Sequence, residues 1–195
     1  GTGFNLVNIG EETHKGIEID SLFFLSENFV LTFAASYIDA IFDDFKNGPC
    51  DRTFVPPASD DCPIVNGGPA RVKDFTGRTP SGVPELAITV SGTYTFNLTE
   101  NMTGYVRGEY IYEDAYQATD AVPIEVPNAL RQVGTLNASL GVKDSASGFS
   151  VMLWGRNIND DEYIYTGFNV PGSPGSYAGY PVVPKMWGLT LSRDF

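Results

Sequence analysis

The sequence is poor in the residue types that most enzymes use for chemistry. Its 195 residues include one histidine, His14, and two cysteines, which are too few ligands for a zinc site. His14 has no serine or cysteine partner at a recognisable spacing, and neither a Gly-x-Ser-x-Gly motif nor a phosphate-binding glycine loop is present. We therefore expect a protein that is not an enzyme and holds no cofactor or metal.

Positive charge is also scarce. Lys and Arg together number 12 against 24 Asp and Glu, which gives a net charge of −12, and charged residues make up only 18% of the chain. A nucleic-acid binder needs a basic surface, so we expect no nucleic-acid partner. Aromatic residues make up 13%, far more than a disordered acidic tail contains.

Long apolar runs are missing as well. The longest apolar stretch, 29–42, is interrupted by Thr32, Ser36 and Asp39, so no segment predicts a membrane-spanning helix. The first residues contain no initiator Met, no basic start and no apolar signal core. We expect a mature chain or a fragment of a longer protein, and we favour the fragment.

Apolar residues instead alternate with polar ones along most of the chain, which predicts β-strands. In 85–97 one face carries Leu86, Ile88, Val90, Gly92, Tyr94 and Phe96. The opposite face carries Glu85, Ala87, Thr89, Ser91, Thr93, Thr95 and Asn97. Seven segments show this pattern more or less cleanly: 15–24, 29–41, 85–97, 102–113, 130–143, 149–158 and 187–195.

The lengths of these segments and of their connections indicate a membrane barrel. Strands of globular proteins have about 5–6 residues, whereas a tilted transmembrane strand needs about 9–11. Short turns near 26–28, 97–101 and 144–148 alternate with long connections near 43–83, 115–129 and 165–185. Outer-membrane barrels have this arrangement. Aromatic residues near both strand ends fit two interfacial belts: Phe29, Tyr94, Phe96 and Phe195 near the short turns, and Tyr37, Tyr110, Tyr112 and Trp187 near the long loops.

We therefore predict an all-β fold, an antiparallel up-and-down transmembrane β-barrel segment whose strands pair in sequence order. Leu86, Ile88, Val90 and Tyr94 are predicted to face lipid, and Thr89, Ser91, Arg107 and Glu109 the lumen. The alternative is a soluble β-sandwich, because its inner face would show the same alternation.

Several short motifs, in order, resemble one family. They are Lys15-Gly16-Ile17-Glu18, Tyr37-Ile38-Asp39-Ala40, Gly77-Arg78-Thr79-Pro80, Trp154-Gly155-Arg156-Asn157-Ile158-Asn159-Asp160-Asp161-Glu162-Tyr163 and Pro184-Lys185-Met186-Trp187-Gly188, with the terminal Phe195. On these residues the chain resembles the C-terminal part of the barrel of TonB-dependent outer-membrane receptors. Ile158, Lys185 and Arg193 depart from the residues commonest in that family.

The resemblance implies a barrel of 22 strands around a plug. Residues 1–195 would be its C-terminal part and supply seven strands, or eight with the end of one at 4–7; the plug and the segment that engages TonB are not in this sequence. The implied function is import of a scarce solute (siderophore-bound iron, cobalamin or an oligosaccharide) across the outer membrane of a Gram-negative bacterium. The implied partners are outer-membrane lipid, the solute, the barrel-assembly machinery and, through the missing N-terminal region, the TonB complex. The alternatives are a small closed outer-membrane barrel with a structural or adhesive role and, less favoured, a soluble carbohydrate-binding sandwich.

Several residues are candidates for specific roles. Cys50 and Cys62 would form a disulfide within the longest loop, or remain two free thiols. Arg107, Glu109 and Glu113 share a polar face and would form a luminal ion-pair network, or contact a solute or the plug. Acidic clusters at 43–44, 60–61 and 160–162 would bind a divalent cation or remain solvated.

The long loops are the expected place of solute recognition, since loops of such length are usually functional or disordered. Loop 165–185 carries Tyr165, Phe168, Tyr177 and Tyr180 as candidate solute contacts, with Tyr177 and Tyr180 favoured; the alternative is that these rings only pack the loops together. The C-terminal set Trp187, Leu189, Leu191 and Phe195 resembles the signal that the barrel-assembly machinery reads.

Overall fold

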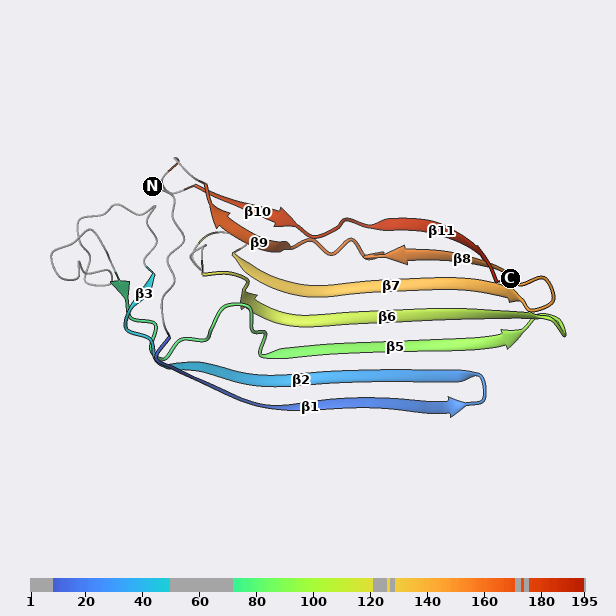
Figure 1. The fold of residues 1–195 in the computed structure, drawn as a ribbon, viewed down its shortest axis with the longest axis horizontal. Helices are drawn as coiled ribbons and strands as arrows, with labels where there is room; N and C mark the ends of the chain where they lie inside the picture. Colours follow the sequence, from blue (N-terminus) through green and yellow to red (C-terminus); the bar gives the residue numbers. More distant parts are fainter. Residues whose placement is uncertain are drawn as a thin grey trace.

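A computed structural model describes residues 9–49, 72–120, 126, 129–170, 173 and 176–194 of the chain (Figure 1). Its elements are strands: β1 (Glu11–Ser26), β2 (Phe29–Asp44), β3 (Gly48–Pro49), β4 (Val72–Lys73), β5 (Leu86–Asn97), β6 (Met102–Gln117), β7 (Leu130–Asp144), β8 (Phe149–Arg156), β9 (Ile164–Asn169), β10 (Tyr177–Pro181) and β11 (Met186–Arg193). Among the described residues, no helix is long and apolar enough to cross a membrane.

Seven of these strands form one antiparallel sheet in the order β1-β2-β5-β6-β7-β8-β11. Each strand of the sheet pairs with the next one along the chain, which confirms the predicted sequential pairing. The tight turns gather at one end of the sheet, and the longer connections leave from the other end (Figure 1). Strands β1, β2 and β6 have 16 residues each, so they extend beyond the predicted segments toward the long connections.

The structure corrects the expectation that 165–185 is a loop. Strands β9 and β10 lie within it and pair as an antiparallel hairpin, with Tyr177 opposite Asn169 and Tyr180 opposite Thr166. The glycines and prolines of this stretch favour a loop, but its β-branched and aromatic residues pair well across a hairpin. The hairpin is a separate two-stranded sheet that lies beyond β8 and β11, on the side of the long connections (Figure 1).

The two faces of the sheet differ in polarity as predicted. The register places Leu31 opposite Gly92, Phe33 opposite Val90 and Tyr37 opposite Leu86 on one face, and this apolar row continues across all seven strands. Thr32 lies opposite Ser91 on the other face.

The apolar face is exposed rather than packed into a core. Exposed fractions reach 68% for Ile17, 63% for Leu189 and 70% for Leu191. The buried apolar residues of the described chain are only Ala40, Phe42, Phe45 and Val133. In the described ranges the remaining sheets are two short hairpins, so no second sheet covers this face as a β-sandwich would require.

The sheet is open in the part of the chain that the structure describes. Its two edges are β1 and β11, which do not pair with each other. Within the described residues these strands therefore form an open sheet with two free edges and not a closed barrel.

Aromatic rings lie over glycines of the neighbouring strand at several places in the sheet. A Cβ at Gly104 would come within 2.6 Å of the Phe96 ring, and one at Gly155 within 2.6 Å of the Trp187 ring. A Cβ at Gly188 would overlap the ring of Trp154. Each of these glycines is required because the ring occupies the space of a side chain.

Candidate binding site on the polar face

The polar face of β6, β7 and β8 carries the residues that could hold a solute. Arg107 and Glu109 lie two positions apart on β6 and therefore point to the same face. The register places Asn137 of β7 opposite Glu109 and Ser139 opposite Arg107. Trp154 of β8 lies opposite Ser139.

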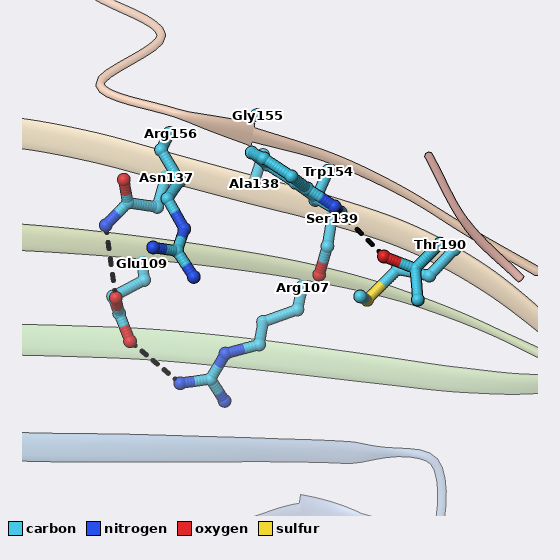
Figure 2. A pocket seen from close by; sticks show the side chains of 10 residues that line it. Arg107, Glu109, Asn137, Ala138, Ser139, Trp154, Gly155, Arg156 and Thr190 are labelled. Atoms are coloured by element: carbon cyan, nitrogen blue, oxygen red, sulfur yellow. Dashed lines mark hydrogen bonds and ion pairs between the residues drawn. The ribbon is translucent and has the colours of Figure 1, made fainter. Parts of the chain in front are cut away.

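These residues surround a hollow of about 660 Å³. Figure 2 shows the side chains that line it, which come from β6, β7, β8 and β11. Its lining consists of Arg107, Glu109, Asn137, Ala138, Ser139, Met152, Trp154, Gly155, Arg156 and Thr190.

A hydrogen-bonded network fixes the Glu109 carboxylate in this hollow. Arg107 Nη2 donates to Glu109 Oε2 at 2.9 Å, and Asn137 Nδ2 donates to Glu109 Oε1 at 3.2 Å. Arg107 Nη1 also donates to Thr93 Oγ1 of β5 at 3.3 Å. Arg107 and Glu109 are thus an ion pair, and both oxygens of the carboxylate have a donor (Figure 2).

Glu113 does not join this network. Its carboxylate pairs with Arg131 of β7, 3.1 Å from Nη2, and accepts a hydrogen bond of 2.9 Å from the Tyr116 hydroxyl. The Arg131 guanidinium also lies 4.9 Å from the ring centre of Tyr165 and 5.3 Å from that of Tyr163. Sequence reasoning missed Arg131, because its partners come from β6 and from the hairpin segment far along the chain.

A second unpredicted feature is the clamp formed by Asn157 and Asp161, where the chain leaves β8. Asn157 is 4% exposed and has a φ of 49°, which ends β8 at Arg156 instead of residue 158. Its side-chain amide donates to the carbonyl oxygens of Asp161 and Val183 at 2.8 and 3.2 Å, and its Oδ1 accepts from Asp161 N–H at 2.7 Å. The clamp therefore joins the two chain segments at the base of the β9–β10 hairpin.

The clamp is tied to the sheet and to the polar network. Gly134 N–H donates to Asp161 Oδ2 at 2.6 Å, so this carboxylate is hydrogen-bonded to the backbone of β7. Asn157 N–H donates to Asn137 Oδ1 at 3.0 Å. Within the described ranges, no group of three or more His, Cys, Asp or Glu residues is arranged to hold a metal ion. The acidic cluster at 60–61 lies outside these ranges.

The four aromatic candidates of the hairpin divide between its two faces. Alternation along β9 and the register with β10 place Phe168 and Tyr180 on one face, where their ring centres lie 5.5 Å apart. Tyr177 lies on the other face. A register shift between Tyr180 and Pro181 interrupts the alternation at the start of β9, and the contact of Tyr165 with Arg131 places this ring on the side of the polar face. The structure therefore places Tyr177 and Tyr180 on opposite faces of the hairpin, and their role as solute contacts stays a prediction.

Two carboxyls beside the strands, those of Asp74 and Asp194, have a lowered pKa. Lys143 Nζ donates to Asp194 Oδ2 at 2.7 Å, which holds the pKa of the Asp194 carboxyl below its usual range. Hydrogen bonds from Thr76 lower the pKa of Asp74 in the same way. Both carboxyls lie outside the strands and take part in hydrogen bonds there.

The remaining predicted residues fall in two groups. Trp187, Leu189 and Leu191 lie on the apolar face of the edge strand β11 and are 60–70% exposed. Cys50, Cys62 and Phe195 lie outside the described residues, so their roles stay predictions.

Comparison with known protein families finds no matching family model, and comparison with curated proteins finds no significant match.

Proposed function

We propose that residues 1–195 are the C-terminal barrel portion of a TonB-dependent receptor that imports a scarce solute across the outer membrane of a Gram-negative bacterium. The observation that carries the proposal is the apolar face of the seven-stranded sheet, which no other part of the described chain covers. An uncovered apolar surface of this extent favours contact with a membrane or a large partner.

The length of the apolar face along the strands supports contact with lipid. Alternating apolar residues span nine positions from Phe29 to Tyr37 in β2 and eleven from Leu86 to Phe96 in β5. A tilted transmembrane strand needs about 9–11 residues. In this interpretation the polar network around Glu109 faces the watery lumen, and the hairpin and long connections lie on the extracellular side.

The open edges support a larger barrel over a small closed one. Unpaired backbone groups of β1 and β11 would cost several kcal/mol each in lipid, so neighbouring strands must cover both edges. The function is then binding and gating without covalent chemistry, with energy relayed through TonB to a plug outside this sequence. The barrel-assembly machinery would insert the protein by reading Trp187, Leu189, Leu191 and Phe195.

Uptake assays in matched strains test the proposal. The gene would be deleted in strains with and without functional TonB and restored as the full-length gene, and uptake of labelled ferric siderophores, cobalamin and oligosaccharides would be measured. We expect restored uptake of one solute class only where TonB is functional. Restored uptake that is equal without TonB, or no restored uptake of any solute, would contradict the proposed function.

A further inference from the structure

We propose that the hollow around Trp154 is a binding site for a singly charged carboxylate attached to an apolar or ring-bearing body, and that Arg156 is the residue that binds the carboxylate. This inference concerns the hollow alone and does not depend on TonB or on transport.

Among the described residues, the charges in the hollow leave one cation without an ion-pair partner. Two guanidinium groups, those of Arg107 and Arg156, and one carboxylate, that of Glu109, line it. Arg107 is neutralised by Glu109, whose second oxygen is occupied by Asn137. In the part of the chain that the structure describes, Arg156 forms no ion pair with any carboxylate. The hollow therefore carries a net positive charge located at Arg156.

The Arg156 guanidinium is held in place by an aromatic ring. Its Cζ lies 5.5 Å from the ring centre of Trp154, a cation–π contact that fixes the cation without neutralising it. Trp154 is itself fixed, because its ring covers Gly188 and its Nε1 donates to Thr190 Oγ1 at 3.2 Å. A positioned guanidinium with free N–H groups matches the two oxygens of a carboxylate.

The other residues that line the hollow determine which kind of group can accompany the carboxylate in a ligand. Met152 and the half-buried Trp154 ring offer apolar contact beside the charge. The Ser139 and Thr190 hydroxyls add polar groups at the edge of the hollow (Figure 2). The one uncompensated charge of Arg156 balances a monoanionic carboxylate, whereas a phosphate dianion would bring a second negative charge that no cation of the hollow is free to balance.

Binding of matched small probes to the full-length protein in detergent micelles tests this site. Benzoate is the probe, benzamide is its neutral isostere, and phenyl phosphate is the dianion, with binding followed by saturation-transfer NMR and titration. Arg156→Gln removes the charge. Arg78→Gln is the matched control, because Arg78 also lies over a ring, that of Phe75 at 5.3 Å, but away from the hollow.

We expect benzoate to bind at least about tenfold more tightly than benzamide, and Arg156→Gln to remove most of this difference, since a hydrogen bond to a charged group typically changes affinity by that factor or more. The Arg78→Gln variant should bind as the wild type does. Equal binding of benzoate and benzamide, or unchanged benzoate binding in Arg156→Gln, would overturn the proposal. Tighter binding of phenyl phosphate than of benzoate would overturn the carboxylate assignment.

Discussion

At the scale of single residues, Asn157 combines an unusual backbone conformation with three side-chain hydrogen bonds. Its φ of 49° turns the chain out of β8, and its amide holds Asp161 and Val183. Asparagine tolerates the left-handed conformation better than other residues with a side chain, glycine apart. Backbone conformation and hydrogen bonding therefore favour the same residue at this position.

Two substitutions at Asn157 separate these contributions. Asn157→Ala loses the hydrogen bonds and adds backbone strain, so we expect the free energy of unfolding to fall by about 2–4 kcal/mol. Asn157→Gly loses the same hydrogen bonds but relieves the strain, so it should be the more stable of the two by about 1–2 kcal/mol. Urea unfolding of the full-length protein in micelles measures both, and equal stability of the two variants would contradict the strain argument.

Neighbouring positions on β5 test the proposal that the apolar face meets lipid. Val90→Arg should cost about 2–4 kcal/mol if the apolar face lies at the membrane midplane. Thr89→Arg is the matched control on the opposite, polar face, and it should insert nearly as well as the wild type. The measured quantity is the amount of folded protein in the outer membrane. Normal insertion of Val90→Arg would show that this face does not contact lipid.

At the scale of elements, the contact between β8 and β11 depends on the ring of Trp154 lying over Gly188. Gly188→Ala forces this ring aside, and we expect a loss of about 1–3 kcal/mol in the free energy of unfolding. Gly108→Ala is the matched control, because nothing lies within 4 Å of a Cβ at that position. It should change stability by less than about 0.5 kcal/mol. Similar losses in both variants would mean that the ring contact is unimportant.

The β9–β10 hairpin gives a second prediction at this scale. If the polar face borders the solute path, replacing Tyr165 with Ala should weaken solute affinity about tenfold or more, since an aromatic contact at a binding site can contribute that much. Tyr177→Ala and Tyr180→Ala should differ in their effect, because the two rings lie on opposite faces of the hairpin. Uptake titrations with the full-length protein measure this. Unchanged affinity in Tyr165→Ala would place the solute away from the polar side of the hairpin.

Sequence alone predicted the seven strands of the large sheet but missed the β9–β10 hairpin, and it predicted strand ends poorly. The two-residue period of 85–97 is a local property, so it identified β5 and its two faces. The end of β8 depends on Asn157, whose conformation is fixed by hydrogen bonds to Asn137 and Val183, 20 and 26 residues away. The Arg131 cluster likewise needs β6, β7 and the hairpin to meet, and no local pattern encodes such a meeting.

At the scale of the whole molecule, stability within the described chain comes from lateral strand pairing. Four buried apolar side chains cannot supply the burial that stabilises a globular domain of this size. The ladders between neighbouring strands, with 15 paired positions between β1 and β2 and 14 between β6 and β7, supply most of the contacts. Covering the apolar face with lipid and both edges with further strands would complete the structure.

This lack of a core has a mechanical consequence. A globular domain pulled apart by force gives way in one event, because its core is lost all at once. Here each strand is held only by the strands beside it in the sheet, as each unit of a repeat protein contacts only the next unit. A chain pulled from its C-terminal edge should therefore unzip from β11 inward in a series of small force peaks, and opening the 8-pair β8–β11 ladder should release a shorter length of chain than opening the 14-pair ladder between β6 and β7.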